Sequence, residues 1–179
     1  ASGYDDSFAV YFSYATFDGT STLIDISNNQ FNLQITQTRL DGIYLDQYFA
    51  MQNGASLRIV NNNATVSAYK LVSWLRGQQV GLTTDASIDL RSNQLVVAAK
   101  TDSAVVFRFE QSCKIDSATV DVQDNIIDVR AYRYVEVFAS ELAYHRHTAI
   151  RWQNNTIVAK CDTDYLEVFD IGALLHGMS

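Results

Sequence analysis

The sequence contains no proline and only 8 glycines among its 179 residues. Proline cannot donate a backbone hydrogen bond to a sheet, so its absence is typical of a chain made mostly of strands and tight turns. With so few glycines, those turns must use Asn and Asp, which tolerate left-handed backbone conformations. The 2 cysteines are too few for a disulfide scaffold or a cysteine-based metal site.

Positive charge is also scarce, because 13 Lys and Arg stand against 20 Asp and Glu, a formal net charge of −7. We therefore expect no nucleic-acid partner, since a basic surface supplies most of the affinity for phosphates. No apolar run approaches the length of about 20 residues that spans a membrane, so we expect no membrane insertion. We also expect no cofactor. The chain begins with Ala1 and shows no secretory signal, so we expect it to be processed or excised from a longer protein.

Hydrophobic residues are abundant instead, at 47%, and they recur with a regular spacing. The pattern aligns on five asparagines, which are Asn29, Asn62, Asn93, Asn125 and Asn155. The residues five and three positions before each Asn, and two, four and six positions after it, are all apolar. Such alternation indicates short strands, and a fixed period of roughly 30 residues is typical of a repeat architecture.

Two all-β folds explain strands that alternate around a two-residue turn. An antiparallel hairpin repeat, closed as a barrel or prism, favours Gly directly after the turn Asn, and Gly follows none of the five. A solenoid of parallel strands stacks equivalent residues about 4.8 Å apart. Each Asn would then turn the corner in the left-handed region and bond through its amide to the next Asn.

The outward column four residues before each Asn favours the solenoid. Opposite charges are neighbours in three of its four steps, as expected if the column is stacked. Its members are Asp25, Arg58, Asp89, Asp121 and Arg151. We therefore predict a parallel β-solenoid of about five coils with three short strands per coil, and keep the antiparallel repeat as the alternative.

At residues 21–170 the chain resembles the right-handed parallel β-helix superfamily, which includes pectate-lyase-like enzymes and phage tail-spike or adhesin domains. The resemblance rests on three strands per coil, on the inward aliphatic stacks and on the five-membered Asn ladder. It implies the architecture and says little about activity. Enzymes of the superfamily usually have more coils and long loops that form a cleft, and this sequence has neither.

The repeat also divides the chain. We expect an N-terminal partial coil or cap at 1–20, a single five-coil domain at 21–170, and a C-terminal cap or partner contact at 171–179. The alternation in 8–12 indicates the third strand of a coil whose first two strands are missing. The later third strands are predicted near 43–49, 71–75, 104–109, 134–138 and 165–169.

Three aspartates are the candidate catalytic residues. Asp89 and Asp121 occupy one outward column in consecutive coils, so their carboxyl groups are expected about 5 Å apart, as in retaining glycosidases. Asp128, on the neighbouring strand, is expected to join them. The alternative, which we favour, is a solvated ladder, because a catalytic acid needs a pKa raised by burial and these positions look exposed. The arginines expected to hold the ladder are Arg58, Arg91 and Arg130.

Histidines and cysteines give weaker signals. On a strand, His145 and His147 share a face with Glu141 nearby, a set that suits a metal site or a pH switch. Two histidines and one distant carboxylate are a poor ligand set, so we favour a solvated loop. Cys161 occupies an inward column, which favours a buried free thiol, with a disulfide to Cys113 as the alternative.

Exposed aromatic side chains along one side of a solenoid suit sugar stacking or contacts between subunits. The candidates are Tyr44, Tyr48, Tyr132, Tyr134, Tyr165 and, in the terminal segment, His176. We expect a structural or adhesive solenoid of a viral or extracellular surface assembly, which binds glycans or self-associates, as a trimer by resemblance to tail spikes. The alternative is a polysaccharide hydrolase or lyase that uses the aspartates. An ice- or mineral-binding face would need regular outward Thr pairs, which are missing.

Overall fold

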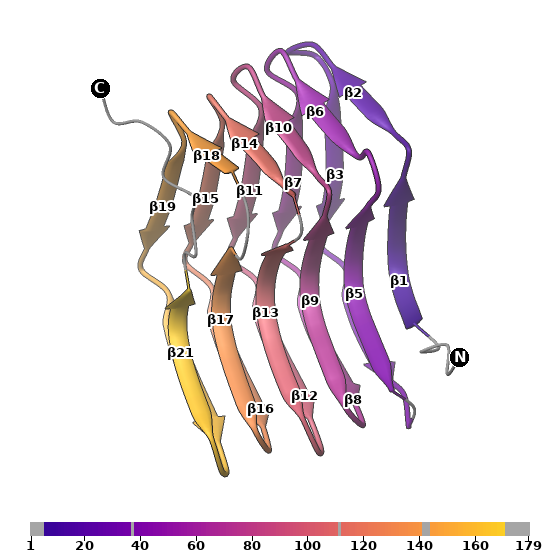
Figure 1. Cartoon of the computed structure of the whole chain (residues 1–179), viewed down its shortest axis with the longest axis vertical. Coiled ribbons are helices and arrows are strands. Elements are labelled where there is room, and N and C mark those ends of the chain that lie inside the picture. The colour runs from indigo at the N-terminus through magenta and orange to yellow at the C-terminus, as the bar shows by residue number, and fades with distance from the viewer. Residues whose placement is uncertain (1–5, 37, 111, 141–143, 171–179) are drawn as a thin grey trace.

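The computed structural model describes residues 6–36, 38–110, 112–140 and 144–170, and every regular element in these ranges is a β-strand. The strands wind into a right-handed coil, in which the front strands ascend, the rear strands descend and the turns stack along one axis (Figure 1). Each strand pairs in parallel with the equivalent strand of the next coil. The predicted solenoid is confirmed, and the antiparallel alternative is wrong.

Each coil contributes strands to four sheets, A to D. Sheet A contains β1 (Asp6–Ser13), β5 (Arg39–Asp46), β9 (Leu71–Gln78), β13 (Ser103–Glu110), β17 (Tyr134–Ser140) and β21 (Tyr165–Asp170). Sheet B contains β2 (Thr16–Asp18), β6 (Ala50–Gln52), β10 (Gly81–Thr83), β14 (Lys114–Asp116) and β18 (Tyr144–Arg146). Sheet C contains β3 (Leu23–Ser27), β7 (Ser56–Val60), β11 (Ser87–Arg91), β15 (Thr119–Gln123) and β19 (Ala149–Gln153). Sheet D contains β4 (Gln30–Gln34), β8 (Asn63–Ala68), β12 (Gln94–Ala99), β16 (Ile126–Ala131) and β20 (Thr156–Cys161).

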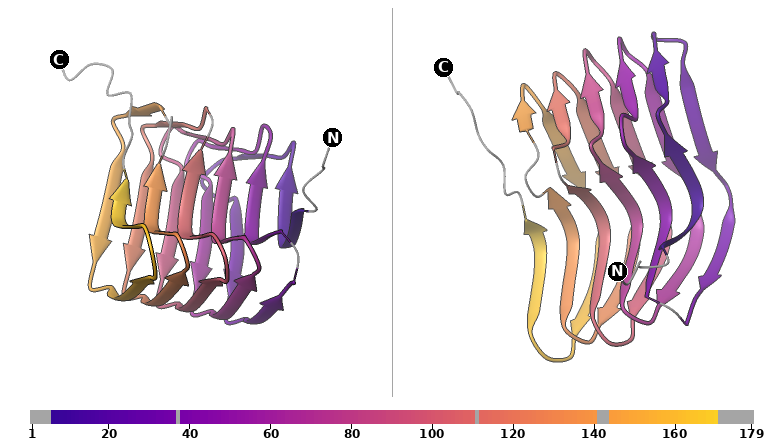
Figure 2. Two further views of the ribbon diagram at one scale, coloured as in Figure 1. Left: turned by 60° about the horizontal axis from the view of Figure 1, so that its bottom comes forward. Right: turned by 45° about the vertical axis from the view of Figure 1, so that its right-hand side comes forward.

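Sheets A, C and D supply the three strands per coil that the repeat predicts. Sheet B adds a short fourth strand, which the sequence analysis did not resolve because three residues are too few to show alternation. The first strand, β1, pairs with β5 in sheet A, so the segment predicted as a third strand at 8–12 does occupy the third-strand position of the repeat. The views in Figure 2 show the described strands stacked from the N-terminal end to the C-terminal end of one continuous solenoid.

Sheets C and D turn the predicted apolar columns toward the core. In one column Leu57, Ile88 and Val120 are paired in register and buried. The two ends of that column, Ile24 and Ile150, are only partly buried, and among the described strands each has a paired neighbour on one side alone. The interior of the solenoid is therefore a stack of aliphatic layers with partly open ends.

The Asn ladder lies at the corner between sheets C and D. Asn93 donates its side-chain amide and its backbone N–H to Oδ1 of Asn125, at 3.0 and 2.9 Å, and the other coils repeat this geometry. The ladder is confirmed, but the expected backbone conformation is wrong by one residue. The left-handed residue precedes each ladder Asn, and the five are Asn28, Asn61, Ser92, Asp124 and Asn154. The preceding residue turns the chain, so that the ladder Asn can point its amide along the stack.

Sheet A differs because its strands bend. Val106 and Phe107 are consecutive, yet both belong to the core, and Trp74–Leu75 and Val137–Phe138 repeat this pair in neighbouring coils. Two successive inward residues break the alternation of a flat strand, and the curvature is visible in Figure 1. The predicted strand at 43–49 is therefore displaced from the observed β5, whose first residues include Asp41 and Gly42 and resemble a loop.

Candidate functional site

The structure brings together two of the three candidate catalytic aspartates. Asp89 in β11 and Asp121 in β15 are direct neighbours across the two strands. They line a depression of about 350 Å³ on the outer face of sheet C, together with Arg58 and Arg91. Asp128 lies around the corner in β16 and does not line this depression. Asp89 and Asp121 are therefore neighbours, as predicted, whereas Asp128 lies apart from them.

Both carboxylates in the depression are already paired with arginine. Arg91 Nη2 lies 3.3 Å from Asp89 Oδ1, and Arg151 Nη1 lies 3.5 Å from Asp121 Oδ1. The expected partner Arg58 pairs with Asp25 instead. These contacts form a partly solvated charge ladder on a flat sheet, and they balance each negative charge with a positive one.

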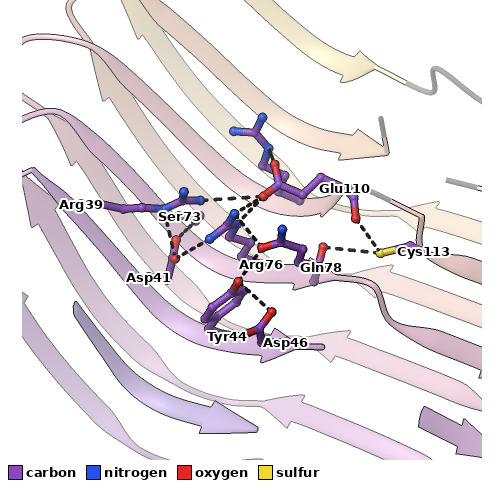
Figure 3. Close-up of polar contacts among 11 residues, drawn as sticks. Arg39, Asp41, Tyr44, Asp46, Ser73, Arg76, Gln78, Glu110 and Cys113 are labelled. Carbon is purple, nitrogen blue, oxygen red and sulfur yellow. Dashed lines mark hydrogen bonds and ion pairs between the residues drawn. The ribbon is translucent and has the colours of Figure 1, made fainter. Parts of the chain in front are cut away.

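A second charged group, which the sequence analysis missed, lies on the outer face of sheet A (Figure 3). We define the sheet A cluster by its members, which are Arg39, Asp41, Ser73, Arg76, Arg108 and Glu110. Arg76 lies at its centre and contacts Asp41 at 3.5 Å and Glu110 through two of its guanidinium nitrogens. The cluster joins strands β5, β9 and β13.

Burial distinguishes this cluster from the ladder on sheet C. The Asp41 side chain has no exposed surface, and the side chains of Arg76 and Glu110 keep only 7% and 9%. Burial by itself would lower the pKa of Arg76, but the charges of Asp41 and Glu110 outweigh burial and raise that pKa above its ordinary value. The arrangement is a network of arginines and carboxylates held largely beneath the surface.

The edge of the cluster is aromatic. The Arg76 guanidinium lies 4.7 Å from the ring centre of Tyr44, and the Tyr44 hydroxyl donates to Gln78 Oε1 at 2.6 Å or to Asp46 Oδ1 at 3.0 Å. Burial is the main reason that the pKa of Tyr44 lies well above the ordinary value. Tyr11 donates to the other oxygen of Asp46, at 3.0 Å. Asp46 therefore links the buried network to an exposed aromatic ring.

An aromatic surface extends outward from this edge. We define it as Phe8, Tyr11, Tyr14 and Tyr48, with Tyr44 beneath it. Phe8 stacks on Tyr11 with ring centres 4.7 Å apart, and Tyr14 lies 5.5 Å from Tyr48. Tyr14 and Tyr48 keep 69% and 68% of their surface exposed. The aromatic surface is confined to the first two coils, at the end of the molecule where the chain begins.

The backbone of Tyr14 and Tyr48 is unusual. Both residues have positive φ, 53° and 65°, which is an uncommon conformation for a bulky side chain. At the same corner of the next coils Gln79 and Ser112 adopt it instead. Strained backbone conformations gather at functional sites, where the surrounding structure holds them in place. The pairing of two exposed tyrosine rings at this corner is the strongest local sign of a binding surface.

The remaining aromatic candidates are spread over the molecule. Tyr132 and Tyr165 are exposed, and Tyr134 is half-buried and stacks on Tyr165 at 5.2 Å with an angle of 7° between the rings. Tyr44, expected at the surface, is buried because the bend of sheet A places it under Tyr11 and beside Arg76. His176 lies outside the described residues.

The sequence analysis favoured a solvated loop for His145, and this prediction is wrong. It lies in β18 and is buried, with Nε2 at 2.7 Å from Ser140 Oγ, and burial lowers its pKa. His147 follows the strand in a left-handed turn and is exposed. Glu141 lies outside the described residues. Within the described ranges, no group of three or more His, Cys, Asp and Glu is placed to hold a metal ion.

The two cysteines are free, so the disulfide alternative is wrong. Cys113 is buried and contacts the carbonyl oxygen of Glu110 at 3.1 Å, and burial raises the pKa of its thiol to about 11. Cys161 is only partly buried, since it ends its column in the last coil. The environment of Cys113 does not activate a thiolate, because a reactive cysteine needs a lowered pKa.

The chain matches no protein-family model, no curated protein and no solved structure. In the described ranges, no helix is long and apolar enough to cross a membrane.

Proposed function

We propose that this chain is a rigid, adhesive β-solenoid that binds glycans through its aromatic surface, as part of a viral or extracellular surface assembly. The observation that carries the proposal is the exposed pair Tyr14 and Tyr48, whose ring centres lie 5.5 Å apart and whose backbones are both left-handed. An exposed aromatic surface of this kind is a common mark of an interaction site.

The chemistry of the surface suits a sugar. Aromatic rings offer apolar faces on which the C–H face of a saccharide ring stacks, while nearby polar groups fix its orientation. Those groups are present, because Tyr11 bonds to Asp46 and the Tyr14 hydroxyl donates to Gln47 Oε1 at 2.5 Å. Both acceptors can also receive hydrogen bonds from sugar hydroxyls. The stacked coils below supply a rigid support, which lowers the entropy cost of binding.

The proposal is tested by screening the protein on a broad glycan array and then titrating a bound oligosaccharide by calorimetry. We expect Tyr48→Ala to weaken binding about tenfold, the effect of losing one aromatic contact of about 1.4 kcal/mol. Tyr69→Ala is the matched control, because Tyr69 is an exposed tyrosine on the opposite corner of sheet A. An array without any bound glycan, or an equal loss in the control, would refute the proposal.

A polysaccharide hydrolase or lyase is the second candidate, favoured by the shared depression that Asp89 and Asp121 line. In that case Asp121→Asn should abolish cleavage of a polysaccharide panel, measured as new reducing or unsaturated ends, while the melting temperature stays unchanged. Asp128→Asn is the control, since Asp128 lies outside the depression and pairs with Arg130. Cleavage that survives Asp121→Asn, or no cleavage by the unaltered protein, removes this candidate.

A further inference from the structure

The four sheets of the solenoid do not all end at the same level. Within the described ranges, sheets B, C and D each contain five strands, whereas sheet A contains six. The extra strand is β21, which pairs with the outer edge of β17. It therefore extends one strand beyond the level of the last complete coil.

The Asn ladder has a direction, so its two ends differ chemically. Each of the first four ladder asparagines donates toward the next coil, and Asn29, at the N-terminal end, uses its amide and backbone N–H in this way. No described residue donates to Oδ1 of Asn29. At the other end, Asn155 donates one amide hydrogen to the Val122 carbonyl at 2.8 Å, and its backbone N–H meets no acceptor among the described residues. One end of the ladder presents an acceptor and the other presents donors.

The charged column on the outer face of sheet C also differs between its two ends, which carry opposite charges. It begins with Asp25 and ends with Arg151. Inside the chain the same kind of step is an ion pair at both ends, between Arg58 and Asp25 and between Arg151 and Asp121, each at 3.5 Å. An arginine of one copy placed beside the aspartate of another would repeat that pairing.

We propose that a second copy of this chain fits head to tail on the first, and that β21 blocks the fit. If β2, β3 and β4 of the second copy paired with β18, β19 and β20 of the first, its β1 would need the edge of β17, which β21 occupies. If its β1 paired with β21 instead, the second copy would be raised by one strand spacing, about 4.8 Å. In sheets B, C and D, the strands of the two copies would then be separated by the space of one missing strand.

In this proposal β21 is the strand that leaves the edge of β17. β21 has 6 residues, whereas β1 has 8. Leu166 and Phe169 remain 45% and 40% exposed, and the Phe169 ring contacts Trp152 and Phe138, with ring centres 4.8 and 6.3 Å apart. Release of β21 frees the edge of β17 and leaves five strands in every sheet, which is a whole number of coils. While β21 is paired with β17 it prevents head-to-tail association, and its release permits that association.

The test uses the full chain with Phe169→Asp, which places a charge against Trp152 and should release β21. Hydrogen exchange should show lost protection in residues 165–170 alone, and sedimentation velocity should change from a monomer to a concentration-dependent series of oligomers. Leu166→Asp is the second route to the same release. Val158→Asp is the matched control, because Val158 is an exposed residue of the last coil that does not hold β21.

The geometry of the assembly is tested by charge. Adding Arg151→Asp to the Phe169→Asp chain sets two aspartates against each other across the contact and should return it to a monomer, and further addition of Asp25→Arg should restore the oligomers. Three results would overturn the proposal: a released β21 with a chain that stays monomeric, β21 still protected in both release variants, or an unaltered chain that self-associates with β21 in place. None of these depends on glycan binding, so the proposed function is tested separately.

Discussion

On the outer face of sheet C, the side chains of Asp89 and Asp121 keep 23% and 19% of their surface exposed, whereas on the outer face of sheet A the Asp41 side chain keeps none. Both faces carry arginine–carboxylate pairs, and both are built from parallel strands in register. They differ in shape, because the strands of sheet C alternate regularly and those of sheet A contain two successive inward residues.

That difference teaches how a repeat can create a site without adding a loop. Where a strand bends, outward side chains on either side of the bend converge, and Asp41 and Arg76 meet across neighbouring strands. Burial then changes what the same ion pair is worth. Exposed pairs contribute about 0–1 kcal/mol, whereas removing one member of a buried pair leaves an uncompensated charge.

The sharpest test compares the two faces directly. Arg76→Met should reduce the free energy of unfolding by about 3–5 kcal/mol, because it leaves Asp41 and Glu110 buried without their shared cation. Arg58→Met, which removes an exposed partner of Asp25, should cost less than about 1 kcal/mol. Chemical denaturation of the two variants measures both values, and equal losses would show that the bend does not set the worth of the charges.

The bend itself is tested at Gly42. A Cβ there would lie 2.4 Å from Cε3 of Trp74, whose ring fills the inner side of the bend. Gly42→Ala should therefore destabilise the protein by about 1–3 kcal/mol, through overpacking rather than backbone strain. Gly19→Ala is a control of another kind, because Gly19 has open space but a φ of 92°. If thermal unfolding showed no loss for Gly42→Ala, the close packing of Trp74 would not fix the bend.

The smallest expected effect is at alkaline pH. The pKa of Tyr44 is raised in the folded protein, chiefly by burial, so the neutral hydroxyl favours the folded state. Its contribution is complete below the unfolded pKa of about 10 and declines as the pH rises above that value. Tyr44→Phe should therefore flatten the loss of stability between pH 10 and 11, measured by urea unfolding. An identical slope in the variant would mean that Tyr44 is accessible to solvent.

The sequence revealed sheets C and D because their residues recur at fixed distances from the ladder asparagines. It did not reveal the sheet A cluster, because Asp41, Arg76 and Glu110 come from three coils and occupy three different positions along their strands. No column of the repeat contains them together. The available signal was the apolar pair represented by Val106 and Phe107, which recurs at one position in successive coils and marks the bend.

The aspartate pair shows the reverse case. Asp89 and Asp121 were predicted to be neighbours from the register alone, and that prediction is confirmed. Register does not reveal which arginine each carboxylate selects, since Asp89 pairs with Arg91 of its own strand rather than with its register neighbour Arg58. Side-chain choice depends on local reach and solvent, which a repeat alignment does not contain.

The one-directional ladder also has a mechanical consequence. Its hydrogen bonds run along the solenoid axis and are loaded in series, so a pull on the two ends is carried by every junction between coils in turn. The end coils have a neighbour on one side only, and they should yield first. Each released coil would add roughly 100 Å of extended chain. Under force the molecule should therefore lengthen in even steps and absorb mechanical energy coil by coil.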